Sequence, residues 1–360
     1  MPNNAHFSGT LRFLIGAAAI GIAVVTVQPY AWLLNSVFLG VLIVVIAAPM
    51  LYWLGRRGLP GWLALLITLL VLAVIAVALV LFSLASVNRL VEALPRYLAE
   101  AESLKETVGS ELERLGVNQS NIQALLTLIN PRQLLELVAG ILAELADVIH
   151  NVVIVVLVVA FLLAETMGLS AKTKKQLSLG EARLARVDQL IHDLRRYISI
   201  TAWLAAATGA TVTFLLLILG VDFPLLWGML TFFLSFIPTV GIFLAMIPPA
   251  LLALLEFGLA KALIVVAGFL LIDALVENVA KPKYLGEGLD LAPAVVILSL
   301  IFWAAVLGPF GALLAVPLTL AFKELVLEAD DRNRWLAALM SGGEHTRPQK
   351  VQEINPGESV

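Results

Sequence analysis

Long uninterrupted runs of hydrophobic residues follow one another along this chain, separated by short polar stretches. Before residue 221 these runs cover residues 11–27, 31–54, 62–84, 148–167 and 197–220. A helix needs about 20 consecutive apolar residues to cross the hydrocarbon core of a membrane. None of the runs shows the polar–apolar alternation of membrane β-barrel strands. The pattern therefore predicts an all-α polytopic membrane protein.

One long region, residues 86–147, departs from this pattern because acidic residues outnumber basic ones and apolar residues are spaced out. Leu90, Leu94 and Leu98, and later Leu134 and Leu137, recur at the spacing of one helical face. This periodicity predicts an amphipathic extramembrane helical region. It is interpreted either as a water-facing subdomain that covers its own aliphatic face, or as a module that contacts another subunit or a partner.

The carboxy-terminal half contains two apolar segments that are each interrupted by proline and glycine. The first interruption reads SFIPTVG over residues 235–241, and the second reads LGPFG over residues 307–311. Each has an apolar arm on either side and a further proline about two turns into the second arm. Such breaks can be either kinks in helices that cross the membrane once or the tips of re-entrant helical hairpins.

Arm length favours the hairpins. At about 1.5 Å per residue, residues 223–237 make about 22 Å of helix, less than the roughly 30 Å hydrocarbon core. The other arms are expected to be similar. The predicted topology is therefore about six full transmembrane helices plus two broken hairpins, with eight crossings as the alternative.

The distribution of positive charge orients the chain. Arg56 and Arg57, the basic segment 170–196, and Lys281 with Lys283 are expected on the cytoplasmic side, with an uncharged turn at Pro29 on the opposite side. Both termini are then cytoplasmic. The first apolar run, without a small-residue cleavage site after it, is expected to be retained as a transmembrane helix.

Together these features divide the chain into five parts. They are transmembrane helices 1–3 (1–85), the amphipathic region (86–147), helices 4–5 with the basic segment 170–196 (148–220), a core with two Pro/Gly hairpins and an intervening helix (221–327), and a polar cytoplasmic tail (328–360).

Composition narrows the function classes. Of 360 residues, 61% are hydrophobic and 14% are charged, which no soluble globular domain requires. The absence of cysteine excludes disulfides and thiolate metal sites, and four dispersed histidines suggest no metal site. A net charge of −3 without a basic patch indicates no nucleic-acid partner. There is no nucleophile–base arrangement and no phosphate-binding loop, so we expect neither an enzyme nor a cofactor, and the lipid bilayer is the surrounding partner.

The two Pro/Gly breaks are the candidate solute-binding elements. Non-helical backbone at membrane depth is tolerated only where protein buries it or where it lines a wet cavity, and transporters place solute sites at such breaks. The alternative is a purely structural role, in which the prolines only shape helix packing. The candidate binding residues are Ser235, Pro238, Thr239 and Gly241 in the first break, and Gly308, Pro309 and Gly311 in the second.

The apolar helix between the two breaks carries the candidate ion-coupling residues. Asp273 and Glu277 lie four residues apart on one helical face, and Asn278 adjoins them. Ionisable residues in transmembrane segments are costly and usually mark a pathway. They are expected to bind Na⁺ or H⁺ as a coupling ion, or else to make structural hydrogen bonds near a backbone break or the interface.

At these residues the chain resembles the autoinducer-2 exporter (AI-2E) family of transporters of the bacterial inner membrane. The resemblance is carried by LGVDFPLLWG (219–228), FIPTVG (236–241), EN (277–278) with KPKYLG (281–286), and LGPFG (307–311) with AVPLT (315–319). The arrangement of apolar segments resembles that of the family over most of the chain, and the specific sequence motifs lie in about the last 170 residues. Ser199-Ile200-Thr201 stands where many members carry a glycine and a glutamine.

The resemblance implies efflux of a small polar signalling molecule or, in other members, Na⁺/H⁺ exchange. It also implies a homopentamer whose protomers move two helical hairpins in an elevator-like manner. Three hypotheses follow: an exporter of a small polar solute, a monovalent cation/proton antiporter that uses the same carboxylates, and a membrane scaffold that acts through residues 86–147 without a solute path.

Overall fold

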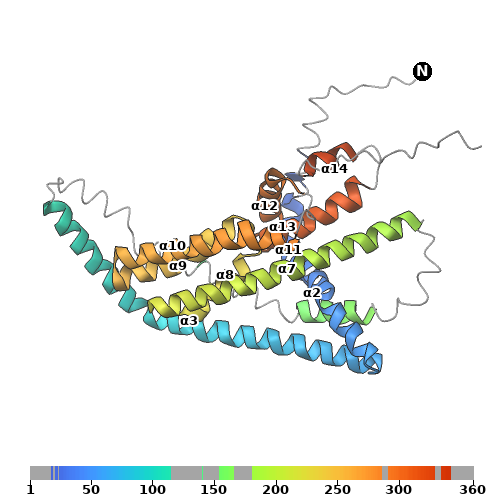
Figure 1. Ribbon diagram of the computed structural model, residues 1–360, viewed down its shortest axis with the longest axis horizontal. Helices are drawn as coiled ribbons and strands as arrows, with labels where there is room; N and C mark the ends of the chain where they lie inside the picture. The colour runs from blue at the N-terminus through green and yellow to red at the C-terminus, as the bar shows by residue number, and fades with distance from the viewer. Residues whose placement is uncertain are drawn as a thin grey trace, which may run out of the picture.

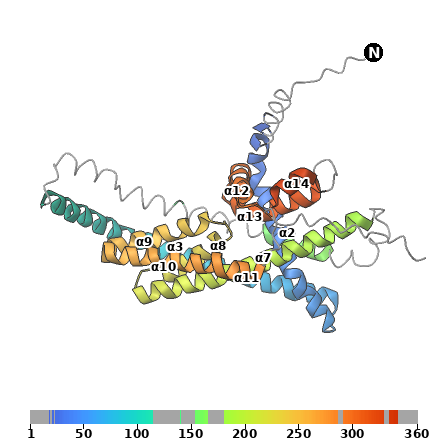
Figure 2. The ribbon, with the colours of Figure 1, turned by 45° about the horizontal axis from the view of Figure 1, so that its top comes forward.

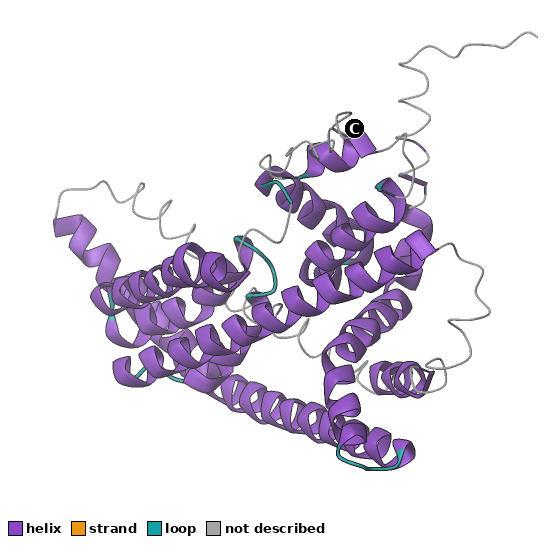
Figure 3. Ribbon diagram, turned by 45° about the vertical axis from the view of Figure 1, so that its right-hand side comes forward, coloured by secondary structure: helices purple, strands orange, loops and turns teal. Residues whose placement is uncertain are grey.

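Helices joined by short turns make up the described part of the chain, and it contains no strand (Figure 3). The computed structural model describes residues 18, 21–22, 24–114, 140, 154–165, 181–285, 291–328 and 334–341. The elements are η1 (Gln28–Tyr30), α2 (Ala31–Arg56), α3 (Gly61–Arg114), a helix at Ile154–Glu165, α7 (Glu181–Leu219), α8 (Pro224–Leu234), α9 (Val240–Phe257), α10 (Leu259–Leu275), η2 (Val276–Ala280), α11 (Lys281–Leu285), α12 (Pro293–Leu307), α13 (Pro309–Phe322), η3 (Lys323–Leu327) and α14 (Arg334–Met340).

Six helices in the described residues are long and apolar enough to cross a membrane. This confirms the prediction of an all-α polytopic membrane protein. The spans are Val24–Arg56, Gly61–Ala93, Asp188–Leu219, Val240–Phe257, Leu259–Tyr284 and Pro309–Leu327.

The predicted turn at Pro29 is wrong. Val24–Arg56 is one helical stretch of 33 residues, in which Gln28–Tyr30 form a single 3-10 turn. Val27 and Ala31, on either side of that turn, both have right-handed helical backbone angles. Proline in the first turn of a helical element loses no hydrogen bond that the element needs, so it can be accommodated without a reversal of the chain. The first two apolar runs therefore meet here without folding back.

The third apolar run and the start of the amphipathic region form a single helix. α3 has 54 residues and runs without interruption from Gly61 to Arg114, with Pro95 inside it. At about 1.5 Å per residue it is about 80 Å long, far more than a membrane crossing requires. Its distal end projects beyond the other helices in Figure 1. Most of the remaining amphipathic region, residues 115–139 and 141–147, lies outside the described residues.

Both Pro/Gly segments fold back as helical hairpins. A Cβ added at Gly241 of α9 would lie 1.8 Å from the Leu234 carbonyl oxygen of α8, so the two arms touch at backbone distance. In the second hairpin, a Cβ at Gly311 of α13 would lie 1.9 Å from the Trp303 carbonyl oxygen of α12. The reversal between α12 and α13 occurs at Gly308, whose φ of 73° favours glycine.

The arms of these hairpins are unequal, which the sequence did not predict. α8 has 11 residues and α12 has 15, both too short to cross. Val240–Phe257, with 18 residues, and Pro309–Leu327, with 19, reach the length of a spanning helix. The expectation that all four arms are short is therefore wrong for the second arm of each hairpin.

The helices form two groups that α7 connects. Trp227, Phe269, Val212 and Leu216 are fully buried in a core that α3, α7, α8, α9 and α10 build together. The second group contains α2, α12, α13 and α14, which gather at the other end of α7 (Figure 2).

The tips of the two hairpins meet. Ile237, in the first break, is buried against Leu300 of α12 and against Ala312 and Ala315 of α13. The two Pro/Gly breaks, far apart in sequence, are therefore brought to one place between the two helix groups.

Candidate functional site

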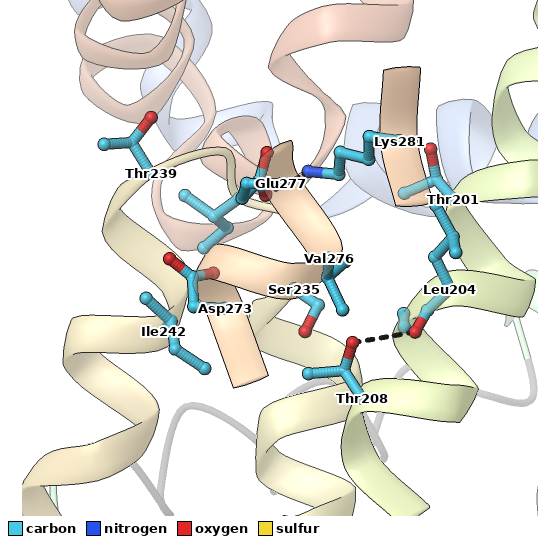
Figure 4. A pocket seen from close by; sticks show the side chains of 12 residues that line it. Thr201, Leu204, Thr208, Ser235, Thr239, Ile242, Asp273, Val276, Glu277 and Lys281 are labelled. Carbon is cyan, nitrogen blue, oxygen red and sulfur yellow. Dashed lines mark hydrogen bonds and ion pairs between the residues drawn. The ribbon is translucent and has the colours of Figure 1, made fainter. Parts of the chain in front are cut away.

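A polar pocket lies beside the first hairpin tip. Its polar side chains come from α7, from the turn between α8 and α9, and from the end of α10 with η2 and α11 (Figure 4). Its cavity volume is about 20 Å³, which is room for about one water molecule in this conformation. The polar residues that line it are Thr201, Thr208, Ser235, Thr239, Asp273, Glu277 and Lys281.

The first hairpin tip has a strained backbone where it meets the pocket. Thr239 has φ 65° and ψ −46°, and the Val240 N–H donates to the Pro238 carbonyl at 2.7 Å. These values describe a tight γ-turn with positive φ, which is rare and unfavourable for a β-branched residue. Such strain, of about 1–3 kcal/mol, persists only where surrounding structure imposes it, and it gathers at functional sites. The tip therefore presents the Thr239 side chain on a backbone that packing holds in place.

The two candidate carboxylates lie where the helix changes its winding. Asp273 belongs to α10, and Glu277 belongs to the π-helical turn η2, which often marks a functional position in a helix. Glu277 pairs with Lys281, four residues further on. The Asp273 carboxylate accepts no hydrogen bond from any described residue, but it lies within electrostatic range of Glu277 and Lys281. The pocket thus holds two carboxylates and one ammonium group.

The hydroxyl groups in the pocket differ in the hydrogen bonds that they can still make with a solute. Thr208 donates to the Leu204 carbonyl at 2.8 Å, and Ser235 donates to the Thr231 carbonyl at 2.6 Å. Their oxygens can still accept hydrogen bonds. Thr201 is only 3% exposed, and its hydroxyl faces the phenol of Tyr197, one helical turn earlier on α7. Thr201 is therefore less available to a ligand than Thr208 and Ser235 are.

The structure brings together four of the residues that the sequence selected. Ser235, Thr239, Asp273 and Glu277 line the pocket. Asn278 does not line it, and its amide donates to the Ala274 carbonyl on its own helix at 3.0 Å.

The other predicted residues shape the hairpins. Pro238 and Gly241 belong to the first tip, where Gly241 permits the close approach of α8 and α9. Gly308, Pro309 and Gly311 form the second tip without lining the pocket.

Sequence reasoning missed Thr201 and Lys281 as pocket residues. The departure from the family pattern at residues 199–201 was a signal for Thr201. The spacing of four residues from Glu277 was a signal for Lys281.

Sequence reasoning also missed two side chains of the amino-terminal helices that hold the second tip. Asn35 donates to the Leu307 carbonyl at 3.0 Å, and Gln28 donates to the Ala305 carbonyl at 2.8 Å. These carbonyls belong to the last turn of α12, where no intrahelical donor follows.

A separate charged cluster lies at the base of the first hairpin. Arg96 of α3 contacts Glu100, Asp222 in the α7–α8 connection, and Glu256 near the end of α9. Tyr97 donates to Asp222 at 2.8 Å. Burial raises the pKa of Tyr97, and this hydrogen bond raises it further. Hydrogen bonding to Glu100, together with the charge of Glu256, raises the pKa of Arg96. The cluster ties α3 to both ends of the α8–α9 hairpin.

Comparison with known proteins assigns the family. Residues 12–330 match the model of the AI-2E family of transporters. The chain belongs to this family. Its membership and its six apolar helices make it a multi-pass membrane transport protein.

Proteins with similar sequences match nearly the whole chain. AI-2 transport protein TqsA of Escherichia coli (strain K12) is 30% identical over 331 residues, which cover 92% of this chain and 96% of the relative. A putative transport protein of Haemophilus influenzae is 29% identical, covering 94% and 98%. The putative transport protein YhhT of E. coli K12 is 26% identical, covering 92% and 95%.

Proposed function

We propose that this protein exports a small polar, hydroxylated solute of the autoinducer-2 kind across the bacterial inner membrane. The observation that carries the proposal is the pocket in which the first hairpin tip, the Asp273–Glu277 face and the α7 threonines meet. The name of the E. coli relative supports the choice of solute. Because that name describes the relative and not this chain, the proposal specifies only the chemical class of the solute.

The pocket chemistry suits a neutral solute with several hydroxyl groups. A polar solute that leaves water must exchange its hydrogen bonds for others, because each uncompensated polar group costs several kcal/mol in an apolar environment. Asp273 and the oxygens of Ser235 and Thr208 can accept hydrogen bonds, and the Thr201 hydroxyl can also donate. Leu204, Ala205 and Ile242 provide apolar walls.

In this proposal the hairpins are the moving part of an elevator-like step. Their tips touch through small side chains, with Ile237 packed on Ala312 and Ala315. Small residues at a helix interface let the helices approach closely. In this proposal the α8–α9 hairpin moves along that interface and shifts the wall that it contributes to the pocket, within a homo-oligomer that the family resemblance implies is a pentamer.

Uptake into inside-out membrane vesicles tests the proposal, because such vesicles accumulate what the intact cell exports. The vesicles are supplied with autoinducer-2, and its accumulation is followed with a bioassay. We expect accumulation with the wild-type protein and about a tenfold loss in Ser235→Ala, since one buried hydrogen bond to a solute is worth roughly 1.4 kcal/mol. Thr211→Val removes a comparable hydroxyl from an exposed position on α7 and is the matched control.

Two results contradict the proposal. One is wild-type accumulation no greater than that of vesicles without the protein. The other is equal loss in Ser235→Ala and Thr211→Val, which would mean that the pocket has no special part in transport.

Monovalent cation/proton antiport is the second candidate, favoured by the carboxylate pair that lines the pocket on an otherwise apolar helix. It predicts that Asp273→Asn abolishes ion exchange at every pH, whereas autoinducer-2 export without ion coupling would survive that substitution. If Asp273→Asn exports normally, neither antiport nor coupling through Asp273 holds. Membership of a transporter family leaves the third hypothesis, a membrane scaffold, without support.

A further inference from the structure

The short helix α14 is docked against the base of the second hairpin, at the end opposite the tip (Figure 1). The Met340 carbonyl accepts a 2.8 Å hydrogen bond from the N–H of Ala292, the residue directly before α12. The Lys323 ammonium, directly after α13, donates to the Ser341 hydroxyl at 2.9 Å. The end of α14 is therefore bonded to both arms of the hairpin.

These contacts hold α14 in place. The helix has only seven residues, and a helix of that length is marginal by itself in water. Ala337 is buried on its docked side. Lys323 is also buried, and a buried ammonium is costly unless polar groups surround it. The Ser341 hydroxyl and the Glu328 carboxylate, at 3.9 Å, are two such groups. Docking thus benefits α14 and the hairpin together.

The opposite face of α14 is apolar and uncovered by the described part of the chain. Trp335 and Leu339 are 60% and 67% exposed. They lie four residues apart, which places them on one helical face. Each is two residues from Ala337, and at about 100° per residue this puts both on the side away from the docked residue. An exposed Trp–Leu pair on a helix that is fixed to the protein needs a partner of its own.

The location of α14 indicates that this partner is lipid. Pro309–Leu327 is one of the spanning helices, and α12 returns along it from the reversal at Gly308. Ala292 and Leu327 therefore lie at the same surface of the membrane, and α14 is bonded to that end of the hairpin. Tryptophan is concentrated at this depth, because its ring is apolar while its N–H can stay near water.

We propose that α14 is an interfacial clasp, whose Ala337 side joins the two arms of the second hairpin and whose Trp335–Leu339 side lies in the headgroup region of the lipid bilayer. Helices with one apolar face lie in the plane of the membrane in this way. The partner is lipid, and not a second copy of this chain or another protein. This surface lies outside the pocket, so the clasp does not depend on which solute is exported.

Spin labelling of the full-length protein in liposomes tests the proposal, because the natural chain has no cysteine. Leu339→Cys carries a nitroxide label, and the liposomes contain phosphatidylethanolamine and phosphatidylglycerol. Electron paramagnetic resonance measures how often the label collides with O₂, which dissolves in lipid, and with a water-soluble nickel chelate. Leu271→Cys, on an exposed surface of the α10 span, is the lipid reference, and Glu102→Cys, on α3 beyond its span, is the water reference.

We expect the ratio of O₂ to nickel collisions at Leu339→Cys to approach that of Leu271→Cys and to exceed that of Glu102→Cys several-fold. Trp335→Cys, on the same face, should give the same result and keeps the test valid if Leu339→Cys fails to fold. Collisions with nickel as frequent as at Glu102→Cys would place this face in water. Few collisions with either reagent would mean that protein covers it, and broadening between labels would identify a second copy. Each of these results overturns the proposal.

The clasp itself is tested by the mobility of the same label. Ser341→Ala removes the hydroxyl that Lys323 contacts, so α14 should loosen and the label at Leu339→Cys should become more mobile. Ser299→Ala is the matched control, because its buried hydroxyl donates to the Val296 carbonyl within α12. Equal mobility in the two backgrounds would show that α14 does not hold the base of the hairpin.

Discussion

The side-chain amide of Asn35 donates a 3.0 Å hydrogen bond to the backbone carbonyl of Leu307, 272 residues away in sequence. Leu307 is the last residue of α12, directly before the reversal at Gly308. Inside a membrane protein such a carbonyl has no water to satisfy it. The contact therefore stabilises the second hairpin tip, and together with Gln28 it fixes that tip to the amino-terminal helices.

Loss of the Asn35 amide should destabilise this attachment. In Asn35→Leu the Leu307 carbonyl becomes a buried acceptor without a donor, which costs about 1–2 kcal/mol. We expect the thermal midpoint in detergent to fall by a few degrees. Ser36→Ala, which removes an adjacent buried hydroxyl that bonds only within α2, should have a smaller effect. Equal midpoints for the two variants would show that the Asn35 contact contributes nothing special.

Gly241→Ala should open the first hairpin. The added Cβ would lie 1.8 Å from the Leu234 carbonyl oxygen, a distance that forces α8 and α9 apart. Overpacking of this kind typically costs about 1–3 kcal/mol, and autoinducer-2 accumulation in vesicles should be lost with the tip geometry. Gly55→Ala is the control, because a Cβ there meets nothing within 4 Å. Normal transport by Gly241→Ala would mean that close contact between the arms is not required.

Tyr97 should make stability depend on alkaline pH. Its pKa in the folded protein is raised above the ordinary value of 10.0, chiefly by burial. The folded state therefore holds this proton more tightly than the unfolded state does, so the contribution to stability is complete below pH 10 and declines as the pH rises above it. Tyr97→Phe should remove that decline.

The measurement is the thermal midpoint of both proteins between pH 8 and pH 11. Tyr97→Phe also loses the hydrogen bond to Asp222, so it should start about 1 kcal/mol less stable. Tyr284→Phe, at an exposed position, should follow the wild-type curve. Parallel curves for wild type and Tyr97→Phe would exclude Tyr97 as the source of the alkaline loss.

A single cysteine at Thr239 should report movement of the first tip, because the natural chain has no cysteine. Thr239 is exposed at the pocket. If the tip alternates between the two sides, an impermeant thiol reagent should label it from either face, and a solute or cation gradient should shift the balance. A cysteine at Phe214, on an apolar exposed surface of α7, should resist the reagent from both faces. Labelling of Thr239→Cys from one face under all conditions would contradict an alternating carrier.

The sequence alone determined those features that local patterns encode. Runs of apolar residues predicted an all-α membrane protein because a helix must satisfy its own backbone in lipid. Proline and glycine located both hairpin tips, and helical spacing placed Asp273 and Glu277 on one face. Ser235 and Thr239 were selected because they adjoin a break, and the structure brings all four residues to one pocket.

Only the tertiary structure decided which distant groups meet. Thr201 joins the pocket because α7 packs beside α10, and the tips meet because Ile237 fits against the small residues Ala312 and Ala315. Pro29 is another case, since the chain around it retains helical backbone angles and does not reverse. The reason is physical: periodicity fixes the faces of each helix, but pairing between helices depends on shape, small residues and polar contacts across the whole assembly. These interactions between helices involve residues that are distant in sequence, so no local stretch of sequence contains both partners.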